Sequence, residues 1–270
     1  MVVVPEEFKP VQNVIYPPGN ILPFERYFDQ EFSKLNPNTF REYLPIHWTA
    51  YCVNSNYGGN KIAMDKLQKF IDSLDKSKKY FSIIQNDDGI LNDVSGIDLL
   101  VYSMGCGKPG YYPIPLISQP LNCQRVELHE KDILYSFFGI NTHPIRERLV
   151  RELNNEYVKL ESIPIDKYYD ILKRSVFAIC PRGYGITSFR LYESLFYSCI
   201  PIYVSDKFWE AFNIPFDIYG IKITENQIKD IPNILKNINI PNMQEIVKQY
   251  YEKYFTYQGC FNSIIKTLTV

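Results

Sequence analysis

The segment from residue 175 to residue 206, SVFAICPRGYGITSFRLYESLFYSCIPIYVSD, constrains the fold more than any other part of the chain. Ser175–Cys180 and Ile200–Ser205 are apolar runs of strand length, and Ser188–Tyr197 between them is interpreted as a helix. A strand, a loop, a helix and a second strand in this order are typical of an open α/β layer. We therefore expect an α/β fold.

The same alternation continues on both sides of this segment. The other expected helices are at Arg26–Lys34, Ile62–Leu74, Pro144–Leu153 and Tyr168–Lys173, and the other expected strands are at His47–Val53, Tyr80–Ile84, Ile97–Met104 and Ile133–Gly139. Pro113–Ile117 is expected to continue as extended chain, and Gln244–Leu268 as a helical tail that is broken at Gln258–Gly259. Two α/β layers fit the length of the chain. We expect an N-terminal domain at 1–130 and a C-terminal domain at 131–270, with the last helix able to cross back to the first domain.

The composition excludes several classes of protein. Of the 270 residues, 46% are hydrophobic, which is enough for a core and argues against a disordered chain. The net charge of −1 gives no long-range attraction to nucleic acid, so we expect no such partner. No apolar run approaches the roughly 18 residues of a membrane span, and the six cysteines are scattered without a CxxC pair. These features predict a soluble, cytoplasmic protein with no membrane span.

One glycine-rich motif is a poor candidate for a cofactor site. Gly105–Gly110 matches GxGxxG and follows an expected strand. A dinucleotide site needs a helix directly after the glycines, and the following YYPIP contains two prolines that oppose one. We interpret the motif as a tight loop. A dinucleotide-dependent oxidoreductase that uses these glycines is a minor alternative.

The loop and helix after Cys180 are a better candidate for an anion site. Gly183 and Gly185 allow close approach of a ligand to the backbone, and Thr187 with Ser188 can cap the helix. The free N–H groups of the helix and the fork of Arg190 in its first turn favour an anion. Glu193 is placed to accept hydrogen bonds from sugar hydroxyls. The competing interpretation is a surface ion pair between Arg190 and Glu193, but the combination favours a nucleoside diphosphate.

These residues also resemble the signature of exostosin-type glycosyltransferases. The family pattern F-x-x-C-P-x-G corresponds to Phe177–Gly183, and S-x-R-x-x-E-(A/S)-L corresponds to Ser188–Leu195. A G-C-I-P-V stretch corresponds to the five residues from Ser198, with Asp206 nearby. Ser198 stands where the family usually has glycine, a departure that concerns packing rather than chemistry.

Further upstream the resemblance is weaker. Phe137-Phe138-Gly139, followed by His143 and Arg146, resembles the opening of the family's nucleotide-binding domain, in which the glycine starts the first β–α turn and the arginine faces the diphosphate. Tyr80–Gly89 resembles the family's strand that ends in H-D-x-G, with Asn86 in the His place and Asp87 at the Asp. The resemblance implies a GT-B architecture, in which two Rossmann-like domains face each other across a cleft. It also implies donor binding by the C-terminal domain and inverting chemistry without a metal.

The candidate catalytic residues are Asp87 and Asp88. An inverting transfer needs a carboxylate that takes the proton of the acceptor hydroxyl, but an Asp-Asp-Gly turn stabilised by its own Asx hydrogen bonds is an equally good interpretation of the residues. The resemblance favours Asp87 as the base, with Asp88 second. His47 is interpreted as structural or acceptor-facing, and His143 as a phosphate contact or a solvated residue at the start of a helix.

We therefore expect an inverting, metal-independent glycosyltransferase that transfers a sugar from a UDP-sugar to a glycan acceptor without a cofactor. Xylose is the sugar that we expect. The expected substrate-binding residues are Gly139, His143, Arg146, Arg182, Gly183, Tyr184, Gly185, Ser188, Arg190 and Glu193. The chain resembles the exostosin-like enzymes of large algal DNA viruses, among which xylosyltransferases occur. A non-catalytic module that binds a sugar nucleotide or a glycan remains an alternative.

Overall fold

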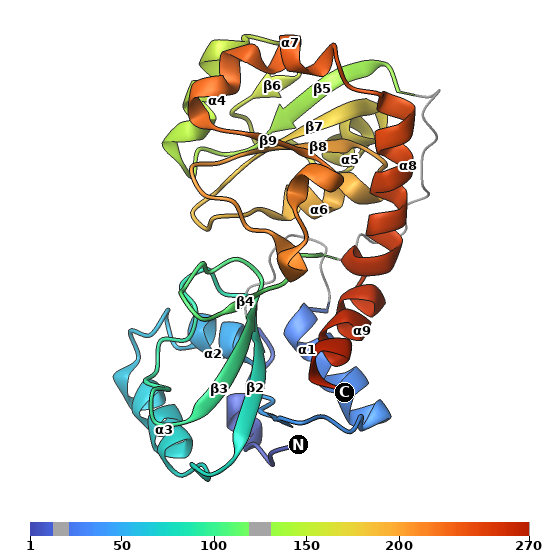
Figure 1. The fold of residues 1–270 in the computed structure, drawn as a ribbon. Coiled ribbons are helices and arrows are strands. Elements are labelled where there is room, and N and C mark those ends of the chain that lie inside the picture. Colours follow the sequence, from blue (N-terminus) through green and yellow to red (C-terminus); the bar gives the residue numbers. More distant parts are fainter. Residues whose placement is uncertain (13–21, 119–130, 270) are drawn as a thin grey trace. The chain divides into compact units, whose positions relative to one another are not determined.

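The computed structural model describes residues 1–12, 22–118 and 131–269, which form two compact units (Figure 1). Unit 1 comprises Met1–Pro115 together with Tyr257–Val270, and unit 2 comprises Leu116–Thr256. Each unit has its own parallel sheet with helices packed against it. Two separate parallel sheets, each with its helices, confirm the predicted fold class, the α/β composition of a GT-B protein.

The sheet of unit 1 has the order β1-β2-β3-β4, and all neighbouring strands are parallel. Its strands are β1 (Glu42–Tyr43), β2 (Lys79–Ile84), β3 (Asp98–Ser103) and β4 (Tyr112–Pro113), and its helices are α1 (Phe24–Leu35), α2 (Trp48–Asn54), α3 (Lys61–Asp72), α9 (Tyr257–Leu268) and the short 3-10 turn Glu6–Phe8. β2 is buried except at its first residue, as expected of a central parallel strand.

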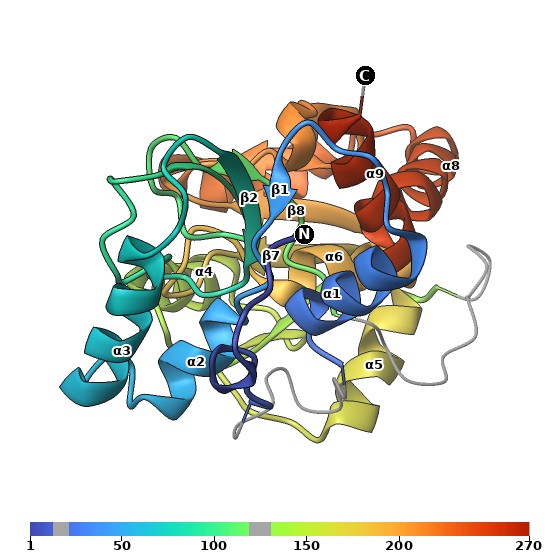
Figure 2. The ribbon, with the colours of Figure 1, turned by 90° about the horizontal axis from the view of Figure 1, so that it is seen from below.

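The first and the last long helix of unit 1 pack against each other, and Figures 1 and 2 both show α1 beside α9. The rings of Phe28 in α1 and Phe261 in α9 have their centroids 4.9 Å apart. Thr267 in α9 shares a hydrogen bond of 2.5 Å with the hydroxyl of Tyr102 in β3. The last residues of the chain therefore complete the core that begins near its start.

The sheet of unit 2 has the order β6-β5-β7-β8-β9, again all parallel. Its strands are β5 (Ile133–Phe138), β6 (Val158–Lys159), β7 (Ser175–Pro181), β8 (Ile200–Val204) and β9 (Ile221–Ile223), and its helices are α4 (Pro144–Leu153), α5 (Ile165–Arg174), α6 (Phe189–Phe196), α7 (Ile231–Leu235) and α8 (Ile240–Tyr250), with 3-10 turns at Ala211–Asn213, Phe216–Ile218 and Glu225–Asp230 and a π-helical turn at Tyr251–Phe255. The order of the strands reverses between β5 and β7. Because parallel crossovers are right-handed, the reversal puts α4 on one face of the sheet and α5 and α6 on the other.

Local signals explain where the helices of unit 2 begin and end. α4 begins with Pro144 at its first position, and His143 Nδ1 accepts a hydrogen bond from the Ile145 N–H over 3.3 Å. α4 ends at Asn154, whose φ of 40° is left-handed. α6 is followed in the same way by Ser198, with φ 56°.

Two expectations about the elements are wrong. His47–Val53 is not a strand, because helix α2 begins at Trp48. The carboxylate of Glu25 accepts the Thr49 N–H at the start of this helix over 3.1 Å, a cap supplied from α1 that no local pattern shows. The tail breaks at Thr256, an extended residue, rather than at Gln258–Gly259. The predicted loop at 105–110 is confirmed, since β4 and not a helix follows it.

Candidate functional site

The predicted donor-site residues of unit 2 lie at the carboxyl ends of β5 and β7. Gly139 follows β5 directly, and the loop Arg182–Ser188 connects β7 to α6. These two strands flank the point at which the strand order reverses. In open α/β sheets the crevice outside the strand ends at such a reversal is where ligands bind. The topology therefore selects this edge independently of any sequence motif.

Arg190 contacts the end of β5 at this point. Its guanidinium carbon lies 4.7 Å from the ring centroid of Phe137 in β5 and 5.4 Å from that of Tyr168 in α5. Its Nη2 donates a hydrogen bond to the carbonyl of Phe138. A Cβ added at Gly139 would lie 3.0 Å from the same Nη2. The side chain of Arg190 is thus held over the first β–α turn.

Two polar atoms at the start of α6 are buried and have no hydrogen-bond partner among the described residues. They are the Oγ of Ser188, which is the N-cap residue but caps no N–H group, and the Nε of Arg190. Buried polar groups in folded proteins are almost always paired. Both atoms are therefore available to a ligand at the N-terminus of α6.

Arg146 is buried beneath the loop and makes hydrogen bonds to its backbone. Its Nε donates to the Arg182 carbonyl and its Nη1 to the Ile140 carbonyl, each over 2.9 Å, and its Nη2 donates to the Pro181 carbonyl over 3.4 Å. A Cβ at Gly183 would lie 3.2 Å from the Nη2 of Arg146. These contacts indicate that Arg146 positions the loop after β7.

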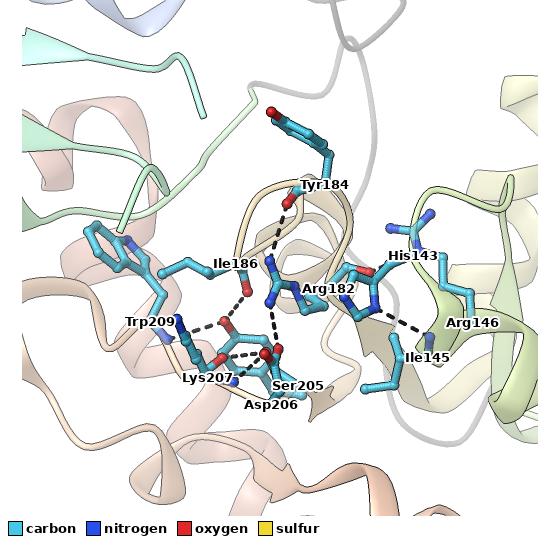
Figure 3. A network of polar contacts seen from close by, with 11 residues as sticks. His143, Ile145, Arg146, Arg182, Tyr184, Ile186, Ser205, Asp206, Lys207 and Trp209 are labelled. Carbon is cyan, nitrogen blue, oxygen red and sulfur yellow. Dashed lines mark hydrogen bonds and ion pairs between the residues drawn. The ribbon is translucent and has the colours of Figure 1, made fainter. Parts of the chain in front are cut away.

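A second network fixes the other side of the loop (Figure 3). Arg182 forms an ion pair of 2.5 Å with Asp206 and donates to the Tyr184 carbonyl over 3.2 Å. Partial burial raises the pKa of Asp206, but the hydrogen bond and charge of Arg182 outweigh it, and the net shift is downward. The Tyr184 ring is 70% exposed and turned away from this network.

His143 and Tyr203 border the same network. Partial burial and the nearby charge of Arg182 lower the pKa of His143, which favours the neutral imidazole. The hydroxyl of Tyr203 donates to the Ile186 carbonyl and accepts the Trp209 N–H over 3.2 Å. Sequence reasoning missed Tyr203, because a tyrosine in a buried strand gives no signal of a partner seventeen residues away.

Glu193 is buried, and its exposed fraction is 6%. One carboxylate oxygen accepts from the hydroxyl of Ser118 over 3.1 Å, and the other accepts from the hydroxyl of Tyr168 over 2.8 Å. Burial raises the pKa of Glu193. In the described part of the chain it forms no ion pair with Arg190, so the competing interpretation of a surface pair is wrong. Tyr168 instead lies between the two, as a donor to Glu193 and a ring beneath Arg190.

The two candidate catalytic carboxylates belong to unit 1. Asp87 and Asp88 occupy the turn that follows β2, and both are half-buried. The Asp88 N–H donates to Asn86 Oδ1 and the Gly89 N–H donates to the Asn86 carbonyl, each over 3.1 Å. Gly89 has φ 69°. The Asx turn therefore exists, and it presents the two carboxylates at the carboxyl end of a central strand.

Neither a metal centre nor a membrane helix is found in the parts of the chain that the structure covers. Among residues 1–12, 22–118 and 131–269, no three His, Cys, Asp or Glu side chains are grouped so as to hold a metal ion. No helix within those residues is long and apolar enough to cross a membrane.

Comparison with known proteins matches the region that carries the predicted donor-site residues. Residues 106–238 match the family model described as "Exostosin GT47 domain". A rice protein (Oryza sativa subsp. japonica) named "Probable glucuronosyltransferase" is 35% identical over 78 residues, which are 28% of this chain and 18% of that protein. The Arabidopsis thaliana protein named "Probable beta-1,4-xylosyltransferase IRX10" is 29% identical over 87 residues, 32% of this chain and 21% of that protein.

Among solved structures, the crystal structure of the GtfA/B complex aligns with a TM-score of 0.43 at 10% identity, over 88% of this chain and 58% of that chain. The matches to the two plant proteins span about a fifth of those proteins. The matched residues 106–238 include β7, the loop after it and α6. Over this region, just under half of its length, the chain is similar to the exostosin GT47 domain.

Proposed function

We propose that this protein is an inverting, metal-independent glycosyltransferase that transfers a sugar from a UDP-sugar to a hydroxyl of a glycan acceptor. The observation that carries the proposal is the position of Arg190. A guanidinium with a buried, unpartnered Nε lies at the reversal of strand order, beside an N-cap residue with an unpartnered hydroxyl. The match to the exostosin GT47 domain supports the same class of reaction.

The charge of the leaving nucleoside diphosphate would be met by two groups in unit 2. The N-terminus of α6 offers backbone N–H groups and the positive end of the helix dipole. Arg190 adds charge-assisted hydrogen bonds, which strengthen as the bond between the sugar and the phosphate breaks. Arg146 would act through the loop, by holding its backbone against β5. This pairing of cation and helix terminus is why we propose a reaction without a metal.

The nucleoside would lie along the loop between β7 and α6. Glu193 uses both carboxylate oxygens, yet each oxygen can accept a further hydrogen bond, which a ribose hydroxyl could supply. The exposed ring of Tyr184 and the backbone of Gly185 are the surfaces we assign to the rest of the nucleotide. Arg182 and His143 would fix the shape of this loop and its approach to the phosphates.

The base in the proposed reaction is Asp87, with Asp88 as the alternative. The carboxylate would take the proton of the acceptor hydroxyl as its oxygen attacks the anomeric carbon, and the bond to the diphosphate would break on the opposite side. Xylose is the donor sugar that we propose, because of the resemblance to exostosin-like xylosyltransferases and because one plant relative is named a xylosyltransferase. A cytoplasmic location and a viral source remain predictions from the sequence.

Binding of UDP to the wild type and to Arg190→Ala, measured by titration calorimetry, tests the proposal. We expect the variant to bind UDP more weakly by about 1.5–3 kcal/mol, the worth of hydrogen bonds to a charged group. Arg174→Ala is the matched control, since Arg174 pairs with Asp132 at an exposed position of the same unit. Equal affinities of the wild type and Arg190→Ala would contradict the assignment of the donor site.

Transfer from UDP-xylose to xylo-oligosaccharides, followed with and without excess EDTA, tests the reaction itself. We expect an inverted product and no loss of rate with EDTA. Loss of activity in EDTA that manganese restores would refute metal independence. UDP binding without transfer or hydrolysis of any UDP-sugar would show a non-catalytic binding module instead.

A further inference from the structure

Unit 1 has a small pocket that none of the proposed roles uses. Its lining comprises the polar residues Gln12, Glu25, Arg26 and His47 and the apolar residues Pro10, Val11, Pro23 and Ala50. The cavity volume is about 30 Å³, room for two water-sized groups at roughly 10–15 Å³ each. The pocket therefore fits one edge of a sugar ring rather than a whole ring.

The pocket lies at the carboxyl-terminal edge of the unit 1 sheet. His47 follows β1 by four residues, and the Gln85 N–H, directly after β2, donates to the Glu25 carboxylate over 2.8 Å. This is the edge at which open α/β sheets bind ligands. Asp87, the proposed base, is two residues beyond Gln85 on the same connection. Pocket and base therefore share one edge of one unit.

A buried hydrogen bond to Asp29 fixes the imidazole of His47 in this wall. Its Nε2 lies 3.3 Å from Asp29 Oδ2, and Lys9 Nζ lies 3.3 Å from the same oxygen. The side chain of His47 is 8% exposed. Burial raises the pKa of Asp29, but the hydrogen bond and charge of His47 together with Lys9 outweigh it, and the net shift is downward. In the neutral imidazole, with Nε2 as the donor to this carboxylate, the other nitrogen, Nδ1, is a hydrogen-bond acceptor.

Two polar groups in the wall of the pocket can still form hydrogen bonds with a ligand. No partner for His47 Nδ1 is found among the described residues, although the side chain is more than nine-tenths buried. The guanidinium of Arg26 makes no ion pair within the same residues. The carboxylate of Glu25, by contrast, already accepts hydrogen bonds from Thr49 and Gln85. His47 and Arg26 thus offer one acceptor and one strong donor to a ligand.

We propose that this pocket is the acceptor subsite, in which His47 Nδ1 and the Arg26 guanidinium hold a hydroxyl group of a neutral acceptor sugar. This inference rests on the proposed function. A sugar hydroxyl both donates and accepts, so it can satisfy His47 and Arg26 at once. The proline and alanine walls match the C–H face of a sugar ring. The charges of Lys9 and Arg26 are offset by Asp29 and Glu25, which favours a neutral sugar over an anionic one.

The kinetic test uses His47→Gln, Arg26→Gln and the control Glu42→Gln, whose side chain forms an exposed ion pair with Lys78 in the same unit. The acceptors are methyl β-D-xylopyranoside, methyl β-D-glucopyranoside and methyl β-D-galactopyranoside. For the acceptor that the wild type uses, we expect KM to rise about 3- to 10-fold in His47→Gln and about 10-fold or more in Arg26→Gln. We expect kcat and the affinity for UDP to stay within about threefold in both variants.

Two kinetic outcomes overturn the proposal. One is an unchanged acceptor KM in both variants. The other is a fall of kcat by about a hundredfold or more in His47→Gln at constant acceptor KM, which would make His47 a base rather than a binding residue.

A binding test separates this inference from the proposed function. The chain contains three histidines, so the imidazole NMR signals of His47 are identified by their absence from His47→Gln. We expect one of the three methyl glycosides to shift these signals in the wild type without UDP. Signals that move with none of the glycosides contradict the subsite even if transfer occurs. A wild type that neither binds UDP nor transfers sugar contradicts the proposed function, and shifted His47 signals would then show that the pocket binds a sugar that is not an acceptor.

Discussion

Gly139 lies directly against the guanidinium of Arg190, so closely that a Cβ at position 139 would stand 3.0 Å from the Nη2 of that arginine. The need for glycine here is one of space, because the backbone at Gly139 is not left-handed. The ring of Phe137 closes the same space from below, 3.4 Å from that Cβ. A glycine after the first strand of unit 2 is therefore what allows Arg190 to reach the strand end.

Gly139→Ala should weaken UDP binding, because the added methyl group displaces the guanidinium of Arg190. We expect a loss of affinity up to that of Arg190→Ala, about 1.5–3 kcal/mol, measured by calorimetry. Gly96→Ala is the control, since a Cβ at Gly96 has no neighbour closer than 4.0 Å and needs no left-handed backbone. If Gly139→Ala binds UDP like the wild type, the position of Arg190 does not matter for the donor.

Asp87→Asn should slow transfer by about 10²–10⁴-fold, the usual contribution of a positioned base. The amide keeps the shape of the side chain but cannot take the proton. UDP affinity should change little, because the residues assigned to the nucleotide belong to unit 2. Initial rates of Asp87→Asn and Asp88→Asn decide between the two carboxylates. If Asp87→Asn transfers sugar at nearly the wild-type rate and Asp88→Asn is inactive, the base is Asp88 rather than Asp87.

Ser198→Gly should stabilise the protein by about 0.5–1 kcal/mol, because Ser198 has a left-handed φ of 56° that glycine adopts without strain. The Ser198 carbonyl would keep its hydrogen bond of 3.0 Å from Gln244. Urea unfolding measures the change. Ser198→Ala, which keeps the strain and loses the hydroxyl, should not gain stability. A glycine variant no more stable than the alanine variant would show that the backbone at 198 is unstrained.

Lys131→Met should destabilise unit 2 by about 2–4 kcal/mol. The ammonium group donates to the carbonyls of Lys173, Ser175 and Tyr197 over 2.8–3.0 Å, and the variant leaves all three without this donor. The exposed Lys229 of the same unit offers the control Lys229→Met. Equal melting temperatures of the two variants would mean that water replaces the ammonium group without cost.

Glu193→Gln should become more stable than the wild type as the pH rises. Burial raises the pKa of Glu193 above its ordinary value of 4.5, so folding disfavours the charged carboxylate. The wild type therefore loses stability as the pH rises through the folded-state pKa, whereas the neutral amide does not. Free energies of unfolding at about pH 4 and about pH 7 should differ between the two proteins mainly at the higher pH. A constant difference would mean that folding does not shift the pKa of Glu193.

Strong local patterns made most of the fold predictable. The buried runs Ser175–Cys180 and Ile200–Ser205 became β7 and β8, and the helix that starts at Pro144 has the expected bounds. The prediction of a strand at His47–Val53 was wrong, because a short run of apolar residues suits a strand and a buried helix equally well. The helix is favoured here by the contact of Thr49 with Glu25, twenty-four residues away.

The candidate site shows the same limit. Its glycines, its N-cap residue and Arg190 could be found from the sequence, because they follow one another within a single crossover. Tyr168 and Ser118 could not, since they reach Glu193 from outside that crossover and carry no motif. The pairing of His47 with Asp29 is also a contact between segments, and nothing in the residues around His47 signals it.

The packing of α9 against α1 also sets an order of events during synthesis. Residues 1–115 leave the ribosome first, but the helix that covers Phe28 and bonds to Tyr102 is made only after unit 2. At about 5–20 residues per second, the first part of unit 1 waits on the order of ten seconds for its final helix. Unit 2 is continuous and can fold during that interval. The nascent chain must therefore keep an exposed aromatic surface on α1 from aggregating until α9 has been made, and a chaperone that binds nascent chains would act at that surface.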